Sequence, residues 1–85
     1  MLFISTFQWE PEKMKEVMEI WMNEKIPSGI EVIKEWIALD VNMVYRLIDV
    51  KDPAALLKQG VFWGSLGYTE MHPVMESGDA MKLMG

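Results

Sequence analysis

Two segments of the chain share one pattern, in which an apolar strand-like run leads directly into an acidic residue followed by proline. The first copy ends at Glu10-Pro11 and the second at Asp52-Pro53. Proline at the first helical position has no N–H to leave unpaired, so each copy predicts a strand followed by a helix. Each copy then continues through an apolar stretch into another strand-like run. The pattern therefore predicts two β-α-β halves.

The spacing of apolar and polar residues sets the expected elements along the chain. Helices are predicted over 11–26 and 53–63, and strands over 2–9, 30–39, 43–50 and 68–75. Gly60 lies inside the second predicted helix, where glycine costs about 1 kcal/mol relative to alanine. We therefore expect that helix to be weaker or to end early.

This order of elements predicts an α+β fold of the ferredoxin-like β-α-β-β-α-β type. Its sheet has four antiparallel strands in the order 4-1-3-2, with two helices on one face. Pro73 in the fourth strand agrees with this order, because an edge strand tolerates a missing N–H. Residues 1–76 are expected to form the domain and residues 77–85 a short C-terminal tail, with a single helical turn at most.

Both faces of the predicted sheet are mostly apolar. A two- or four-residue loop between strands two and three would fix which residues share a face, and the repeat then adds strand one. One face would carry Leu2, Ile4, Thr6, Ile33, Glu35, Ile37, Leu39, Val44, Arg46 and Ile48. The other would carry Phe3, Ser5, Phe7, Val32, Lys34, Trp36, Ala38, Met43, Tyr45, Leu47 and Asp49. Glu35 and Arg46 are expected to pair across their strands.

Two helices can cover only one face of such a sheet, so the second apolar face needs another cover. The chain is also rich in large apolar residues, with 51% hydrophobic residues, four Trp and nine Met among 85 residues. A small domain with this composition gains burial by oligomerising. We expect a homodimer formed through the sheet face. The pattern leaves open which face meets the helices, and whether assembly goes beyond a dimer.

Charge and cysteine content exclude several classes of function. The net charge is −5, from 13 acidic and 8 basic residues, which disfavours nucleic acid and anionic membranes as partners. No apolar run approaches the roughly 20 residues that span a bilayer. The absence of cysteine and of paired metal-ligand spacings leaves no expected metal site, and no cofactor is expected. Without a signal-peptide pattern, the expected location is cytoplasmic.

The candidate ligand-pocket residues are mostly aromatic. Trp36, Tyr45 and Asp49 share a predicted face, and aromatic rings around one carboxylate can form a pocket between sheet and helices. The alternative is that the rings belong to the core and that Asp49 is a solvated strand-end residue. Trp63 ends the second helix as a packing anchor or a pocket wall. His72 is the only histidine, so any histidine-based chemistry depends on it. The pattern assigns no catalytic residue.

The chain resembles a family of small uncharacterised prokaryotic proteins, a domain of unknown function in the dimeric α/β-barrel superfamily. The resemblance covers nearly the whole sequence and rests on the order and spacing of short motifs. These are Phe7, Glu10, Pro11 and Glu12; Glu35, Trp36, Ala38 and Leu39; Asp49, Asp52 and Pro53; Trp63; and the segment 68–76 with Pro73-Val74. It implies a ferredoxin-like subunit whose sheet packs on that of a second copy. The family pattern has histidine after the strand-two tryptophan, where this chain has Ile37.

Three functions are compatible with these features. The first is a homodimeric α/β-barrel protein that binds a small apolar or aromatic molecule between sheet and helices. The second is a cofactor-independent monooxygenase-like enzyme acting on an aromatic substrate, with Trp36, Tyr45, Asp49 and His72 around the pocket. The third is a structural or regulatory dimerisation module. An enclosed cavity with Asp49 or His72 facing inward would favour the first two, and a solid interior would favour the third.

Overall fold

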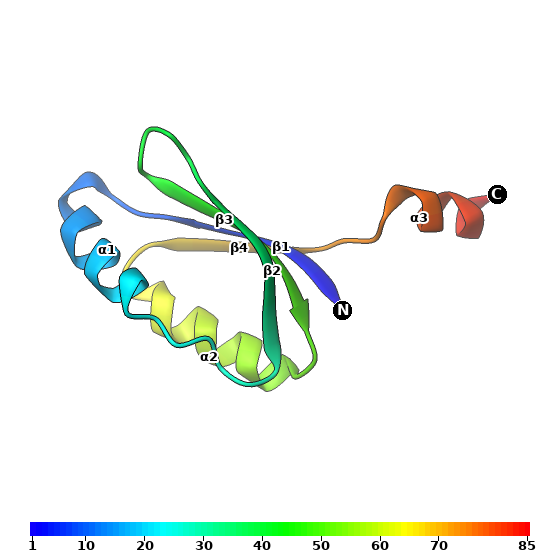
Figure 1. The fold of residues 1–85 in the computed structure, drawn as a ribbon, viewed down its shortest axis with the longest axis horizontal. Helices are drawn as coiled ribbons and strands as arrows, with labels where there is room; N and C mark the ends of the chain where they lie inside the picture. Colours follow the sequence, from blue (N-terminus) through cyan, green and yellow to red (C-terminus); the bar gives the residue numbers. More distant parts are fainter.

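The computed structural model describes residues 1–85, and its elements follow the predicted order (Figure 1). The strands are β1 (Leu2–Gln8), β2 (Ile30–Ile37), β3 (Met43–Val50) and β4 (Tyr68–Pro73). The helices are the 3₁₀ turn η1 (Pro11–Lys13), α1 (Met14–Met22), α2 (Pro53–Gly64) and α3 (Ser77–Met84). The predicted tail thus contains an eight-residue helix rather than a single turn.

The four strands form one antiparallel sheet in the order β2-β3-β1-β4. This is the predicted 4-1-3-2 order read from the opposite edge, so the ferredoxin-like α+β fold is confirmed. β4 is an edge strand, and Pro73 is the last residue of its pairing with β1. The proline therefore removes no hydrogen bond from the interior of the sheet.

The two helices of the repeat begin differently. Asp52 is the N-cap of α2, and its side chain accepts a hydrogen bond from the backbone N–H of Ala54 at 3.0 Å. Such a cap satisfies one of the unpaired N–H groups at a helix start. Glu10 makes no comparable bond, and the first helix opens with the 3₁₀ turn η1 before α1.

The helix ends also differ from the sequence prediction. α1 stops at Met22 instead of continuing to residue 26, because Asn23 leaves the helical conformation and its side-chain amide donates to the carbonyl of Glu19 at 2.8 Å. α2 continues past Gly60 to its end at residue 64, so the expected early end is wrong. Buried Ala55 and Trp63 anchor this helix on both sides of the glycine.

The predicted assignment of residues to the two sheet faces is partly wrong. In β1, Phe3 and Ser5 pair with Ile48 and Arg46, so they share the Arg46 face instead of the Tyr45 face. The two halves of the repeat differ in the distance between the strand and the proline. The buried Trp9 lies two positions before Pro11, whereas the buried Val50 lies three positions before Pro53. Aligning the two prolines therefore shifts β1 by one residue and assigns its side chains to the wrong face.

A β-bulge accounts for the remaining difference. The register of β2 against β3 shifts between Val32 and Lys34, so Val32 pairs with Ile48 on the Arg46 face. One extra residue, Ile33, interrupts the alternation of side chains in β2. The residues of β2 before Ile33 therefore lie on the face opposite to the predicted one. The predicted pairing of Glu35 with Arg46 lies beyond the bulge and is confirmed.

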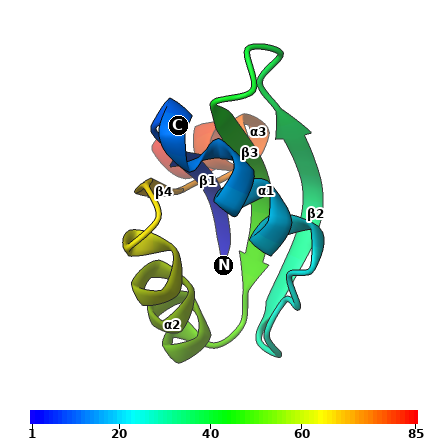
Figure 2. The ribbon, with the colours of Figure 1, turned by 90° about the vertical axis from the view of Figure 1, so that its left-hand side faces the viewer.

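The Arg46 face is the one that meets the helices. Side chains from α1 and α2 meet this face in a small core of Trp9, Val17, Val44, Trp63 and Leu66. Figure 1 shows α1 and α2 together beside the sheet, and Figure 2 shows them in front of it and to one side. Only eight of the 85 residues are buried, so this core is small and the opposite face of the sheet stays open.

Two glycines bring separate segments close together. Gly29 has a φ of +97°, in the left-handed region, and its carbonyl accepts bonds from the backbone N–H groups of Lys51 and Asp52 at 2.8 and 3.2 Å. A Cβ at Gly67 would lie 2.2 Å from the carbonyl oxygen of Gln8. Only glycine therefore lets the start of β4 approach β1 this closely.

Candidate functional site

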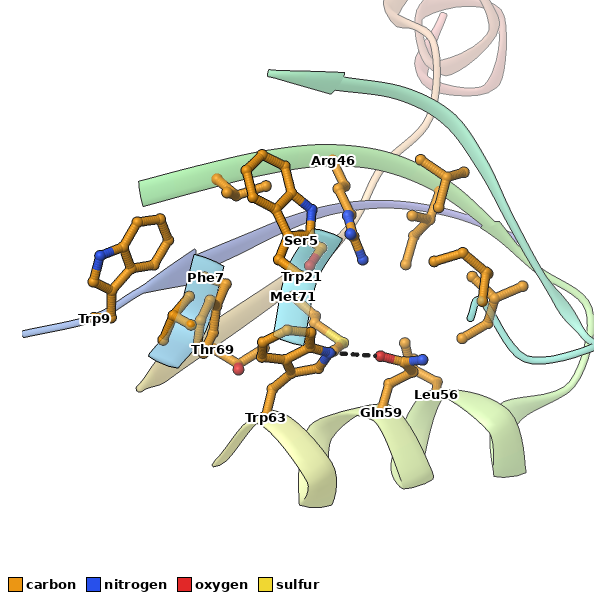
Figure 3. A pocket seen from close by; sticks show the side chains of 16 residues that line it. Ser5, Phe7, Trp9, Trp21, Arg46, Leu56, Gln59, Trp63, Thr69 and Met71 are labelled. Atoms are coloured by element: carbon orange, nitrogen blue, oxygen red, sulfur yellow. Dashed lines mark hydrogen bonds between the residues drawn. The ribbon is translucent and has the colours of Figure 1, made fainter. Parts of the chain in front are cut away.

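A pocket lies between the sheet and the two helices of the repeat (Figure 3). Its cavity volume is about 60 Å³, and 12 of its 16 lining residues are hydrophobic, so the site is apolar with a few polar groups. The sheet contributes side chains from all four strands, α1 contributes Val17 and Trp21, and α2 contributes Leu56, Gln59 and Trp63. The site therefore depends on the packing of the whole domain.

Aromatic rings form one end of the pocket. The ring centroids of Phe7 and Trp63 are 5.0 Å apart with the planes tilted by 58°, and those of Phe7 and Trp9 are 5.8 Å apart. Such tilted contacts are favourable beyond the area that they bury. Trp63 is 8% exposed and Trp9 is 3% exposed, so these rings are fixed in place by the core.

Arg46 points from the middle of β3 into the pocket (Figure 3). Its Nη2 donates to Glu24 Oε1 at 2.5 Å, its Nη1 donates to Glu24 Oε2 at 3.3 Å, and its Nε donates to Glu35 Oε2. The side chain of Glu24 is only 7% exposed and that of Arg46 only 16%, whereas that of Glu35 is 31% exposed. One guanidinium thus serves two carboxylates, and the group of three carries a net negative charge.

Indole and amide groups complete this polar network. Trp63 Nε1 donates to Glu24 Oε2 at 3.2 Å and to Gln59 Oε1 at 2.9 Å, the second bond being drawn in Figure 3. Trp21 Nε1 donates to Glu35 Oε2 at 3.4 Å. The ends of α1 and α2 are thereby tied to β2 and β3 through the pocket's charged group.

The pKa of Arg46 reflects the competition between burial and its partners. Burial by itself would lower this pKa, but the hydrogen bonds and charges of Glu24 and then Glu35 outweigh burial and raise it above its ordinary value. Arg46 is therefore a permanent cation with its charge committed to the two carboxylates. It cannot supply or take up a proton at ordinary pH.

Two buried polar atoms on the pocket lining have no hydrogen-bond partner within the protein. They are Nε1 of Trp9 and Oγ1 of Thr69. Unpaired buried polar atoms are rare in folded proteins because each forfeits the hydrogen bond that it made to water. The lining thus carries two polar groups whose hydrogen bonds the protein itself does not satisfy.

Of the five residues singled out from the sequence, only Trp63 lines the pocket. Trp36 and Tyr45 pair with each other on the open face of the sheet and are 45% and 39% exposed. Asp49 lies on the same open face, where it accepts a hydrogen bond from the amino group of Met1 at 2.9 Å. The expectation that these three line a cavity between sheet and helices is wrong, because the helices cover the opposite face.

His72 lies on the edge strand β4, where its Nε2 is 3.3 Å from Glu70 Oε2. The side chains of both residues are more than half exposed. His72 pairs with Ile4 of β1, so it also belongs to the open face and does not contact the pocket. It is therefore placed for a role on the surface or in an interface, not in the cavity.

The polar centre of the pocket is the part of the site that sequence reasoning missed. Arg46 stands between Val44 and Ile48 on one strand face, and a charged residue between two core positions is a signal for a buried polar site. Helical spacing alone places Glu24 on the solvated side of a helix that reaches residue 26. Only the early end of α1 turns Glu24 toward Arg46.

The structure holds no group of three or more His, Cys, Asp or Glu side chains arranged to bind a metal ion. It also has no helix of sufficient length and hydropathy to cross a membrane.

This fold and this pocket define a small ferredoxin-like α+β protein with an aromatic site between its sheet and its helices. The chain belongs to the DUF3303 family, a domain of unknown function, whose model matches residues 1–85. The resemblance to an uncharacterised family is thereby confirmed. No curated protein and no solved structure shows significant similarity to the chain.

Proposed function

We propose that this protein is a homodimeric α/β-barrel protein that binds a small apolar or aromatic molecule between its sheet and its helices. The observation that carries the proposal is the aromatic pocket with the Arg46 group at its centre. Ligand sites in proteins are commonly concave and apolar, with a few polar groups that orient the ligand.

The size of the cavity limits the ligand. An engineered cavity of about 150 Å³ binds benzene, whereas this one has a volume of about 60 Å³. A ligand larger than a few non-hydrogen atoms must extend toward the surface. Ile26 lines the pocket and is 39% exposed, so the site reaches solvent beside this residue.

The charge of the pocket favours one kind of polar group on the ligand. Three of the N–H groups of Arg46 already bond to carboxylates, and the two carboxylates exceed the single cation by one charge. An anionic ligand would meet this excess negative charge, whereas a hydroxyl or ammonium group would donate a hydrogen bond to it. The proposed ligand is therefore neutral or cationic.

The homodimer is supported by the surface that one subunit leaves exposed. A compact protein of 9.9 kDa is expected to expose about 5,200 Å², whereas this chain exposes 6176 Å². The excess is comparable to the roughly 800 Å² that each partner buries in a stable complex. The open sheet face carries Ile4, Trp36, Tyr45 and Leu47, which a second copy would cover.

The monooxygenase alternative depends on a pocket formed by Trp36, Tyr45, Asp49 and His72. These residues lie on the open sheet face, away from the cavity. None of the residues that line the cavity is a histidine or a cysteine. We therefore propose binding without assigning a reaction.

The test is an NMR titration that follows the four indole N–H signals. The probes are benzyl alcohol, benzylamine and benzoate, which differ only in the polar group. We expect saturable shifts of the Trp63 and Trp21 signals with the alcohol and the amine, and weaker binding of benzoate. Trp36 lies on the other face and serves as the internal control. Shifts confined to Trp36, or no saturable shift with any probe, would overturn the proposed site.

A further inference from the structure

The C-terminal helix α3 makes no extensive contact with any other helix or strand. It lies at the opposite end of the molecule from α1 in Figure 1, and behind the sheet in the view of Figure 2. Its apolar side chains Met81, Leu83 and Met84 are 67%, 78% and 79% exposed. Its polar residues Asp79 and Lys82 lie one turn apart on the other side. α3 is thus an amphipathic helix whose apolar side has no cover in its own subunit.

A helix of this length is not stable by itself. Isolated helices shorter than about 12–15 residues are marginal in water, because nucleation costs more than a few hydrogen bonds return. α3 has eight residues, and its N-cap residue Glu76 makes no side-chain capping bond. The helix therefore needs packing against another surface to persist.

The shape of the chain indicates where that surface is. A compact domain of 85 residues has an expected radius of gyration of about 12 Å, whereas this chain measures 14.2 Å and is 48 Å long. The segment from Val74 to Glu76 leads straight away from the edge strand, and Val74 still bonds to Leu2 of β1 at 2.9 Å. The arm thus extends past the sheet instead of folding back over its own helices.

We infer that α3 docks its apolar side on a second copy of this chain. The inference depends on the proposed homodimer and adds a further contact to it. Each subunit would place its C-terminal arm, residues 74–85, on the other subunit. A second copy is the occupant that the area supports, because the surface in excess of a compact monomer matches one side of a dimer interface. Twofold symmetry then gives every dimer two such contacts.

The first experiment measures dimerisation of the full chain by sedimentation equilibrium. The test variant is Met81→Ser/Leu83→Ser/Met84→Ser, and its control is Asp79→Ser/Lys82→Ser on the polar side of the same helix. Each arm would lose three apolar side chains that the proposed contact buries. This loss should raise the dimer dissociation constant by at least about 100-fold. The control should change it less than about threefold, since exposed charges contribute little.

The second experiment locates the arm. The chain has no cysteine, so Lys82→Cys gives a single site for a spin label. In a mixture of spin-labelled chain and ¹⁵N-labelled chain that lacks the spin label, relaxation enhancement in the ¹⁵N-labelled copy reports only contacts between subunits. We expect broadening of a contiguous set of amide signals in that copy. No broadening in the ¹⁵N-labelled copy, under conditions where sedimentation shows a dimer, would overturn the inference.

The outcomes separate the arm from the dimer. If the full chain is a dimer and the apolar variant dimerises equally tightly, the arm contact is refuted and the sheet-to-sheet dimer stands. If the full chain is a monomer at 100 µM, a concentration well above the dissociation constants of about 1 µM or lower expected for a stable dimer, both fail.

Discussion

Replacing Arg46 with methionine tests the electrostatics of the pocket most directly. The substitution keeps much of the side-chain volume but leaves the carboxylates of Glu24 and Glu35 without their cation. Removing one partner of a buried ion pair typically costs about 3–5 kcal/mol, because the remaining charge is buried without compensation. Glu24 is almost fully buried and Glu35 is less so, which places the expected loss near the lower end, about 3 kcal/mol.

The assay is urea unfolding followed by tryptophan fluorescence at a fixed protein concentration, since dimerisation would otherwise change the apparent stability. At neutral pH, Arg46→Met should lower the free energy of unfolding by about 3 kcal/mol. Adding Glu24→Gln and Glu35→Gln to the same chain should restore most of the stability.

Two results would refute this reasoning. A loss below about 1 kcal/mol at neutral pH is the value for an exposed ion pair, and it would show that water screens the group. A loss that Glu24→Gln and Glu35→Gln do not restore would indicate a packing defect instead of an unpaired charge. In either case the expected preference of the pocket for neutral or cationic ligands would lose its basis.

Three further predictions concern particular contacts. In the same urea assay, Gly67→Ala should lower the free energy of unfolding by about 1–3 kcal/mol, because its Cβ would collide with the neighbouring strand. Gly60→Ala is the control: its Cβ meets nothing within 4 Å, so this substitution should raise the free energy of unfolding by up to about 1 kcal/mol. The hydrogen bond to Glu10 raises the pKa of Tyr68, so this contact stabilises the fold below the ordinary tyrosine pKa and the stabilisation is lost as the pH rises through the raised value. Ultraviolet titration should therefore show one late-ionising tyrosine that Tyr68→Phe removes. Leu47→Glu on the open sheet face should produce a folded monomer in sedimentation, and an unchanged dimer would place the interface elsewhere.

The fold was predictable from the sequence because several local signals agreed. The two acid-proline starts marked both helices of the repeat, and Pro73 identified an edge strand. Chain order and crossover handedness then left one common topology. None of these signals depends on which side chains point to which face.

The site was not predictable, because it depends on which residues share a sheet face and on which face the helices cover. One extra residue at Ile33 reverses the alternation in β2, and no turn residue or proline marks that bulge. One extra residue between β3 and α2 likewise breaks the correspondence between the two halves of the repeat. A shift of one residue moves a whole strand face to the other side of a sheet, and Phe3, Ser5 and Val32 were thereby assigned to the wrong face. Trp36, Tyr45 and Asp49 do share one face, and they miss the pocket because the helices cover the opposite face, a choice that the pattern left open.

The bulge in β2 also bears on whether further strands can add to the edges of this sheet. An edge strand presents unpaired N–H and C=O groups on which further chains can stack without limit. In this sheet one edge is interrupted by the bulge beside Lys34, and the other edge ends in Pro73. Both features block continuous strand addition. The homodimer proposed above would instead cover the exposed apolar face of the sheet, and such an assembly is complete with two subunits.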